Sequence, residues 1–289
     1  MREDTGIYLG TKNIFGEARL GSKTMIKFLF PKSNRSIQHS WEWMGEFFPS
    51  LTRAPSTQYY LECEKELFRS FFPDFQEKRI LKTDLWDEAK NTQILKWVAR
   101  QGSEVFGLDI SFSIVSKAKI LFESHEKKGF IVSDLRNIAY ADESFDYIYS
   151  MGTIEHFRES FQALKECFRV LRKGGKAIFG VPNKYDPFLR PLMVFILRKL
   201  GLYAFGYEKS FSRKQLEIML EEAGFRIVAN SGILFMPGEF RMFDLFLHVL
   251  WPESTFLTKP MIIPFAFLYK KLPFIRRHGY LIACIVERP

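Results

Sequence analysis

Three aspartates each close a short, strand-like segment of the sequence. They are Asp84, Asp109 and Asp134, at the ends of segments 79–84, 104–109 and 129–134. A carboxylate in such a position can accept hydrogen bonds from both hydroxyls of a ribose, or from the exocyclic amine of an adenine. Asp109 directly precedes a predicted helix and fits the ribose role, whereas Asp134 fits the adenine role. Both also have a plain structural interpretation, as the acid of a helix start or of a turn.

One histidine, His156, follows a fourth strand-like segment at residues 145–151. An imidazole there could take a proton from a hydroxyl group, which makes His156 a candidate general base. It could equally be a structural residue that is bonded to the backbone of a turn. His39, His125 and His248 have no partner at metal-ligand spacing, so we expect no catalytic metal.

Strand-like and helix-like segments alternate between residues 55 and 230, which predicts right-handed crossovers and a mostly parallel sheet. Strands are expected at residues 79–84, 104–109, 129–134, 145–151, 177–181, 225–230 and 280–286, and helices at 57–72, 92–100, 111–124, 160–171 and 212–223. Residues 173–176 are expected to form a turn. Such sheets bind ligands at the carboxyl ends of their strands. The chemistry should therefore lie just after Asp84, Asp109, Asp134 and Met151.

The loop after the first strand, residues 85–92, reads LWDEAKNT and contains no glycine. Glycines let a backbone approach a phosphate or an amino-acid group closely, so their absence argues against NAD or FAD. The acids Asp84, Asp87 and Glu88 would also repel a pyrophosphate. A cationic ligand that carries a sulfonium and an ammonium group suits this loop better.

The composition is that of a folded protein, because 47% of the 289 residues are apolar and 16% are aromatic. Three cysteines are too few and too scattered for a disulfide scaffold or a four-cysteine zinc site, which predicts reduced thiols and a cytoplasmic protein. The sequence contains no run of about 18 uncharged apolar residues, so we expect no membrane-spanning helix. The net charge of +9 allows attraction to phosphate-rich or membrane surfaces.

Three stretches follow one another in a characteristic order. Residues 142–150 read DESFDYIYS, residues 153–157 read TIEHF, and residues 164–175 read LKECFRVLRKGG. Together they resemble the class I S-adenosylmethionine-dependent methyltransferases of the ubiquinone/menaquinone-biosynthesis-like type, over residues 78–183 and more weakly to residue 230. The resemblance implies a Rossmann-like α/β fold. Its seven-stranded, mostly parallel sheet would have an antiparallel last strand and helices on both faces.

The resemblance also implies a cofactor, S-adenosyl-L-methionine, and roles for individual residues. Asp109 would hold the ribose, and Asp134, with the backbone of Leu135, would meet the adenine. The segment 150–153, with Ser150, Met151 and Gly152, would line the methionine side. Asp84 would stand near the amino-acid end, and Ile110 would be a further cofactor-binding residue. The implied activity is methyl transfer to a small or lipid-like acceptor. A nucleic-acid substrate is disfavoured because no Asn-Pro-Pro-Tyr-like motif follows the fourth strand.

The first motif departs from the family pattern of an acid followed by Gly-x-Gly, because residues 82–88 read KTDLWDE. Asp84 could take the place of the acid or of a glycine. This departure leaves open a catalytically inactive scaffold with this fold. The basic, Phe-rich C-terminal inserts leave open a second alternative, a membrane-surface binding protein.

The expected organisation is an N-terminal extension or lid at residues 1–55 and a methyltransferase domain at residues 56–289. Two apolar inserts, at about 186–208 and 232–276, interrupt the domain. They predict an apolar acceptor pocket or a peripheral membrane face. The structural alternative is that they form core packing and lid helices. The prolines of the second insert predict short lid pieces rather than a long helix; they are Pro252, Pro260, Pro264 and Pro273.

Overall fold

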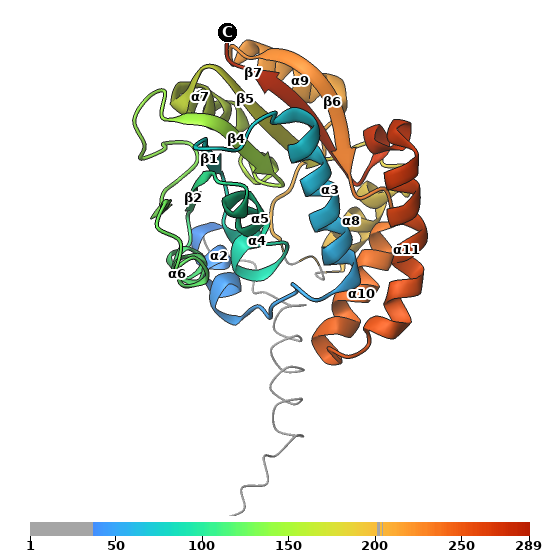
Figure 1. The fold of residues 1–289 in the computed structure, drawn as a ribbon. Helices are drawn as coiled ribbons and strands as arrows, with labels where there is room; N and C mark the ends of the chain where they lie inside the picture. The colour runs from blue at the N-terminus through green and yellow to red at the C-terminus, as the bar shows by residue number, and fades with distance from the viewer. Residues whose placement is uncertain (1–36, 201–202, 204) are drawn as a thin grey trace, which may run out of the picture.

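The computed structural model describes residues 37–200, 203 and 205–289, so residues 1–36 of the predicted extension lie outside the described residues. Seven strands form one sheet in the order β3-β2-β1-β4-β5-β7-β6, with β7 antiparallel to both of its neighbours. This confirms the predicted fold class. Figure 1 shows the sheet with helices on both sides and the helices α10 and α11 beside α3.

The strands are β1 (Arg79–Lys82), β2 (Glu104–Asp109), β3 (Lys128–Val132), β4 (Phe145–Met151), β5 (Leu171–Pro182), β6 (Arg226–Ile233) and β7 (Leu281–Glu287). The α-helices are α2 (Ile37–Phe47), α3 (Pro55–Phe71), α4 (Trp86–Lys90), α5 (Ile94–Arg100), α6 (Phe112–Leu121), α7 (Ser160–Val170), α8 (Arg190–Lys199), α9 (Arg213–Glu222), α10 (Gly238–Leu250) and α11 (Thr255–Lys271). Two short 3-10 helices, η1 (Ile154–His156) and η2 (Pro273–His278), complete the described elements.

A hydrophobic core lies on each face of the sheet. Alternate residues of β7 supply the two cores, with Ala283 and Ile285 in one and Cys284 and Val286 in the other. The first core also contains buried side chains of α3, α5, α6 and α11, and the second contains those of α7 and α9. Because side chains alternate along a strand, a strand covered on both faces reads as a continuous apolar run, as β7 does.

The prediction of short helical pieces in the second insert is wrong, because α11 runs unbroken through Pro260 and Pro264. Both prolines lie on the exposed side of the helix, whereas Thr258, Ile262 and Tyr269 are buried. The carbonyls that lose their intrahelical partners therefore face water, and packing against α3 holds the helix together.

Two local predictions also need correction. The expected turn at residues 173–176 belongs to β5, whose register with β4 jumps from the pair Phe145–Leu171 to the pair Tyr147–Lys176. Gly174, at φ 71°, donates its N–H to the Arg288 carbonyl at 2.8 Å, a partner beyond the reach of any local pattern. The expected loop 85–92 contains the short helix α4.

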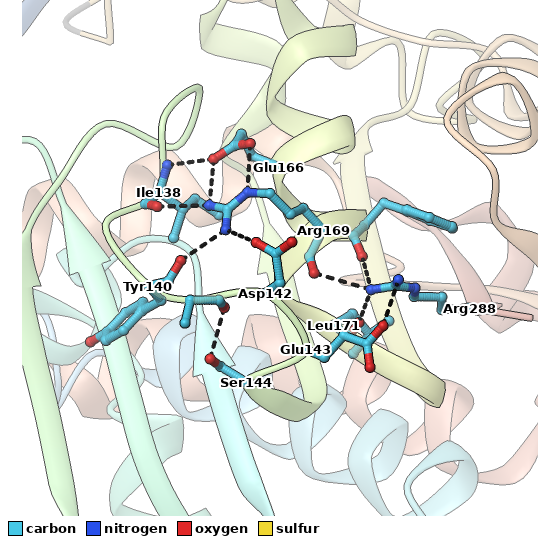
Figure 2. Close-up of polar contacts among 11 residues, drawn as sticks. Ile138, Tyr140, Asp142, Glu143, Ser144, Glu166, Arg169, Leu171 and Arg288 are labelled. Carbon is cyan, nitrogen blue, oxygen red and sulfur yellow. Dashed lines mark hydrogen bonds and ion pairs between the residues drawn. The ribbon is translucent and has the colours of Figure 1, made fainter.

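The motif that carried much of the resemblance has a structural role at Arg169 (Figure 2). Its guanidinium donates to the carbonyls of Ile138 and Tyr140 at 2.8 and 2.9 Å and binds the carboxylates of Glu166 and Asp142. Arg288 adds bonds to three carbonyls at the end of α7 and to a nearby carboxylate. These contacts fix the segment that leads from the end of β3 into β4.

Candidate functional site

A cavity of about 520 Å³ opens at the carboxyl ends of the central strands. The residues that follow β1, β2, β3 and β4 line one side of it, including Asp84, Asp109, Ile110, Asp134, Leu135, Met151 and Gly152. The helices α2, α8 and α10 line the other side with mostly apolar side chains. Since β1 and β4 flank the point where the strand order reverses, this is where a sheet of this kind binds ligands.

Asp109 is a buried carboxylate of the cavity that the backbone anchors. It ends β2, is 8% exposed, and accepts hydrogen bonds from the backbone N–H groups of Leu85 at 3.0 Å and Ser111 at 2.9 Å. Burial raises the pKa of Asp109 to about 7, although these two hydrogen bonds oppose the rise. Each oxygen keeps a free lone pair, so the carboxylate can still accept from two hydroxyls of a ligand.

The loop after β1 is held by a lysine that the sequence analysis did not single out. Lys82 is fully buried, and its Nζ lies 3.0 Å from Asp84 Oδ1 and 3.4 Å from Asp87 Oδ2. Burial by itself would lower the pKa of Lys82, but the two aspartates raise it above its ordinary value. When both aspartates are ionised, the group carries one net negative charge, which favours a cationic ligand.

A glycine of the neighbouring strand β2 makes room for a side chain of the glycine-free loop. A Cβ atom at Gly107 of β2 would lie 2.4 Å from Leu85 Cδ2, so the absence of a side chain there lets Leu85 pack inward. Trp86 points the other way and lines the cavity, where its ring packs edge-on against Phe48 with the ring centroids 5.0 Å apart. The loop thus offers side chains, not an open backbone, to a ligand.

Asp134 lines the cavity but is already paired. Its carboxylate forms a bidentate contact with the guanidinium of Arg136, at 3.0 and 2.7 Å, and accepts from the Arg136 backbone N–H. Those hydrogen bonds lower the pKa of Asp134, with burial opposing them. The side chain is therefore fixed as an ionised acceptor at the end of β3.

Of the predicted site residues at the end of β4, Met151 and Gly152 line the cavity and Ser150 does not. Gly152, at φ 76°, adopts a left-handed conformation that favours glycine, and with Met151 it lines the cavity. Thr153 donates to Asp84 Oδ2 at 3.0 Å, which ties this segment to the β1 loop. Ser150 is not among the lining residues; its side chain is 1% exposed, and its hydroxyl has no hydrogen-bond partner within the described part of the chain. The structure therefore separates Ser150 from the other predicted site residues.

His156 lines the cavity at the end of η1, and its Nδ1 lies 2.8 Å from the Tyr207 carbonyl oxygen. A carbonyl oxygen only accepts, so Nδ1 carries the proton and Nε2 of the neutral ring is the acceptor. Burial lowers the pKa of His156, although the charge of Glu208 and the bond to Tyr207 oppose this. The imidazole is thus held neutral with one nitrogen able to take a proton.

Three buried charged residues of the cavity were missed by the sequence analysis. Glu155 and Arg190 are 2% and 3% exposed, and Glu208 lies 2.7 Å from the Arg190 guanidinium. Burial raises the pKa of Glu155 well above its ordinary range. A lysine inside the apolar strand β1, followed by acids two and five positions later, was a usable signal for Lys82. No local pattern marks Arg190 or Glu208.

The described part of the predicted N-terminal extension covers the cavity. Trp41, Trp43 and Phe47 of α2 line it, and Glu42 accepts from the Ser111 hydroxyl at 2.8 Å and the Ser113 N–H at 2.9 Å. The helix α2 is thereby tied to the start of α6, directly beside Asp109.

Within 37–200, 203 and 205–289, no three histidine, cysteine, aspartate or glutamate side chains come together in a way that could hold a metal ion. Among the helices in those same ranges, none has the length and apolar character needed to cross a membrane.

The cavity residues fit S-adenosylmethionine. The volume of the cavity lies within the range of small-molecule sites, roughly 300–1,000 Å³. It combines acids that suit a ribose, an adenine amine and an ammonium group with an apolar wall at Leu108, Leu135 and Met151. The carboxyl group of Glu155 has one buried oxygen without a partner among the described residues, so the cavity also has unused polar capacity.

Comparison with known proteins gives a family match for part of the chain. Residues 90–179 match the family model described as "Methyltransferase domain". The ubiquinone biosynthesis O-methyltransferase of Mesorhizobium japonicum is 29% identical over 150 residues, which cover 48% of this chain and 58% of that protein. The chain thus matches somewhat more than half the length of such curated relatives.

Solved structures share the fold at low sequence identity. A methyltransferase from Thermotoga maritima, described as a possible histamine N-methyltransferase, has a TM-score of 0.56 and 16% identity, with 88% of this chain and 100% of that chain covered. The [4+2]-cyclase SpnF has a TM-score of 0.55 and 15% identity, with 93% and 97% covered. Residues 90–179 therefore match a methyltransferase domain, and the strand order around them is similar to that of S-adenosylmethionine-dependent methyltransferases.

Proposed function

We propose that this protein binds S-adenosylmethionine in the cavity and transfers its methyl group to a small, largely apolar acceptor. When bound, the cofactor supplies a methyl group on a cationic sulfur. The observation that carries the proposal is the buried carboxylate of Asp109, which lines the cavity at the end of β2 and is anchored by two backbone N–H groups. A carboxylate fixed in this way is positioned to accept from a ribose.

The other proposed roles follow the same edge of the sheet. Ile110 would contact the ribose, Asp134 and Leu135 the adenine, and Met151 and Gly152 the methionine part. Asp84, held by Lys82 and Thr153, would face the ammonium group. Ser150 has no proposed contact with the cofactor, because it is not among the residues that line the cavity.

His156 is the proposed general base on the acceptor side. Methyl transfer needs mainly an aligned acceptor and the exclusion of water, and a base matters only where the acceptor must lose a proton. The neutral ring, with Nε2 as its acceptor atom, is suited to remove that proton. The apolar side chains of α2, α8 and α10 would exclude water from the same region.

Cofactor binding by the purified protein tests the proposal. Titration calorimetry with S-adenosylmethionine and S-adenosylhomocysteine should give dissociation constants on the order of micromolar, about −8 kcal/mol of binding free energy. A thermal shift with each ligand should accompany the heat. Folded protein with no heat and no thermal shift at millimolar ligand would instead support the inactive scaffold.

A lipid-like acceptor and a peripheral membrane contact are the finer part of the proposal. Three residues line the cavity and are also exposed, namely Phe47 at 50%, Met242 at 42% and Phe246 at 43%. The rim of the cavity is therefore apolar. Further exposed apolar residues lie on α8, α10 and α11: Leu192, Phe195, Ile196, Phe243, Leu250, Phe256, Leu257 and Phe267.

Exposed apolar side chains on these helices, together with lysines and arginines on α8 and α11, fit the boundary of an anionic membrane. The exposed cations include Arg198 and Lys199 on α8 and Lys259, Lys270 and Lys271 on α11. An acceptor with a long apolar tail could then reach the cavity without passing through water.

Liposome sedimentation tests this contact. The wild-type protein should bind vesicles of phosphatidylcholine with phosphatidylglycerol more strongly than phosphatidylcholine alone, because anionic lipids attract its cations. A Phe243→Ser/Leu250→Ser variant should lose at least about threefold in the bound fraction, since it removes two exposed apolar side chains that would be buried in the membrane boundary. The matched control is Phe161→Ser on α7, a side chain 41% exposed on the other face of the sheet. Equal binding by both variants and wild type would contradict the membrane contact.

A further inference from the structure

The turn that carries His156 is bonded to a distant segment at residues 207–209. Tyr207 accepts from His156 Nδ1 at 2.8 Å, and the Lys209 N–H donates to the Glu155 carbonyl at 3.1 Å. Two adjacent bonds therefore connect the end of η1 to a segment about 50 residues further along the chain. The orientation of the imidazole depends on the position of this segment.

A buried ion pair holds the segment in place. Glu208, directly after Tyr207, is 9% exposed and lies 2.7 Å from the guanidinium of Arg190. Its second oxygen accepts a hydrogen bond from the Tyr203 hydroxyl. Arg190 is 3% exposed and stacks on the Tyr280 ring, with its Cζ 4.3 Å from the ring centroid.

Arg190 is in turn fixed by the start of α8. The Arg190 N–H donates to Asp186 Oδ2 at 3.1 Å, which anchors the first turn of the helix. The guanidinium thus reaches Glu208 from a rigid element, and each charge of the pair is buried with its partner. Removing one partner would leave a buried, uncompensated charge beside His156.

We infer that Arg190 and Glu208 are positioning residues for His156: their ion pair holds the Tyr207 carbonyl where it keeps the proton on Nδ1, so that Nε2 is the nitrogen that receives a proton from the acceptor. The functional meaning rests on the proposed role of His156 as a base. The tautomer of His156 does not depend on that role, because it can be observed in the absence of any acceptor.

The charges around His156 predict the direction in which its pKa should shift when Glu208 or Arg190 is replaced. Glu208 and Asp84 favour the imidazolium and raise its pKa, whereas Arg190 and burial lower it. Replacing Glu208 by a neutral residue should therefore lower the pKa of His156 further. Replacing Arg190 should raise it, because Glu208 then loses its partner and acts on the imidazole alone.

The experiment is ¹⁵N NMR of the full-length protein labelled at histidine, with the His156 signals assigned by a His156→Gln variant. Wild type should show the Nδ1–H tautomer and a pKa below the ordinary 6.5. Glu208→Gln should move the pKa down and Arg190→Met should move it up, each by about half a unit or more. Tyr203→Phe, which leaves both charges in place, should keep the tautomer and move the pKa less.

An Nε2–H tautomer in wild type, or pKa shifts of the same sign in the two charge variants, would overturn the inference. A local collapse of the segment would move both variants toward 6.5, which the opposite signs distinguish. Titration with S-adenosylhomocysteine separates this result from the proposed function. Absence of binding by wild type would count against cofactor use, while the tautomer and the signs would still decide the role of the ion pair.

Discussion

Asp109→Asn should weaken the binding of S-adenosylhomocysteine by about 10- to 100-fold, which corresponds to about 1.4–2.8 kcal/mol. The carboxylate accepts from the N–H groups of Leu85 and Ser111 and has lone pairs left for a ribose. An asparagine keeps one acceptor oxygen and turns an NH₂ group toward a backbone donor. It therefore loses acceptor capacity at the point where the ligand needs it. Titration calorimetry of both proteins measures the change.

Two control variants separate the contact from general damage. Glu126→Gln changes an exposed acid far from the cavity lining and should leave affinity unchanged. Asp134→Asn should weaken binding less than Asp109→Asn, because the Asp134 carboxylate is already engaged by Arg136. Thermal unfolding of each ligand-free variant checks that it is folded. Wild-type affinity in a folded Asp109→Asn protein would remove Asp109 from the site.

Lys82→Met should destabilise the protein by about 3–5 kcal/mol at neutral pH, the cost typical of breaking a buried ion pair. The fully buried ammonium is the cation that Asp84 and Asp87 share, so its loss leaves two carboxylates without compensation. Methionine fills a similar volume, which keeps the cavity term small. The free energy of unfolding from urea denaturation measures the effect.

The matched control is Lys173→Met, which removes the charge of an exposed lysine in β5 and should change stability by less than about 0.5 kcal/mol. Adding Asp87→Asn to Lys82→Met should recover part of the lost stability, because one uncompensated charge disappears. A Lys82→Met protein as stable as wild type would mean that the two aspartates do not depend on the lysine.

The parts of the fold that the sequence predicted depend on short-range signals. The helix starts at Ser111 and Ser212 follow from residues within one turn, and both serines accept from a backbone N–H three residues later. The strand-end acids Asp109 and Asp134 were found because a parallel sheet brings its carboxyl ends to one edge. Periodicity and strand order need no knowledge of distant partners.

The resemblance also rests on residues whose role is structural. Residues 169–171 (RVL) are part of the motif that resembles the family. The Arg169 guanidinium holds the segment between β3 and β4 in place (Figure 2). Arg169 is not among the residues that line the cavity. A motif of this kind predicts the fold well because it forms the fold. It says less about the acceptor, because the proposed acceptor side of the cavity is lined by other parts of the chain.

By itself the sequence determined the sheet, the acidic edge that suits S-adenosylmethionine and the position of His156. Tertiary structure alone decided that α11 continues through two prolines, that Gly107 makes room for Leu85, and that Ser150 lies outside the cavity. It also decided that Arg190 and Glu208 hold the segment against His156. The physical reason is common to all four: burial and pairing depend on neighbours from other elements, and no local pattern encodes which neighbours the folded chain will supply.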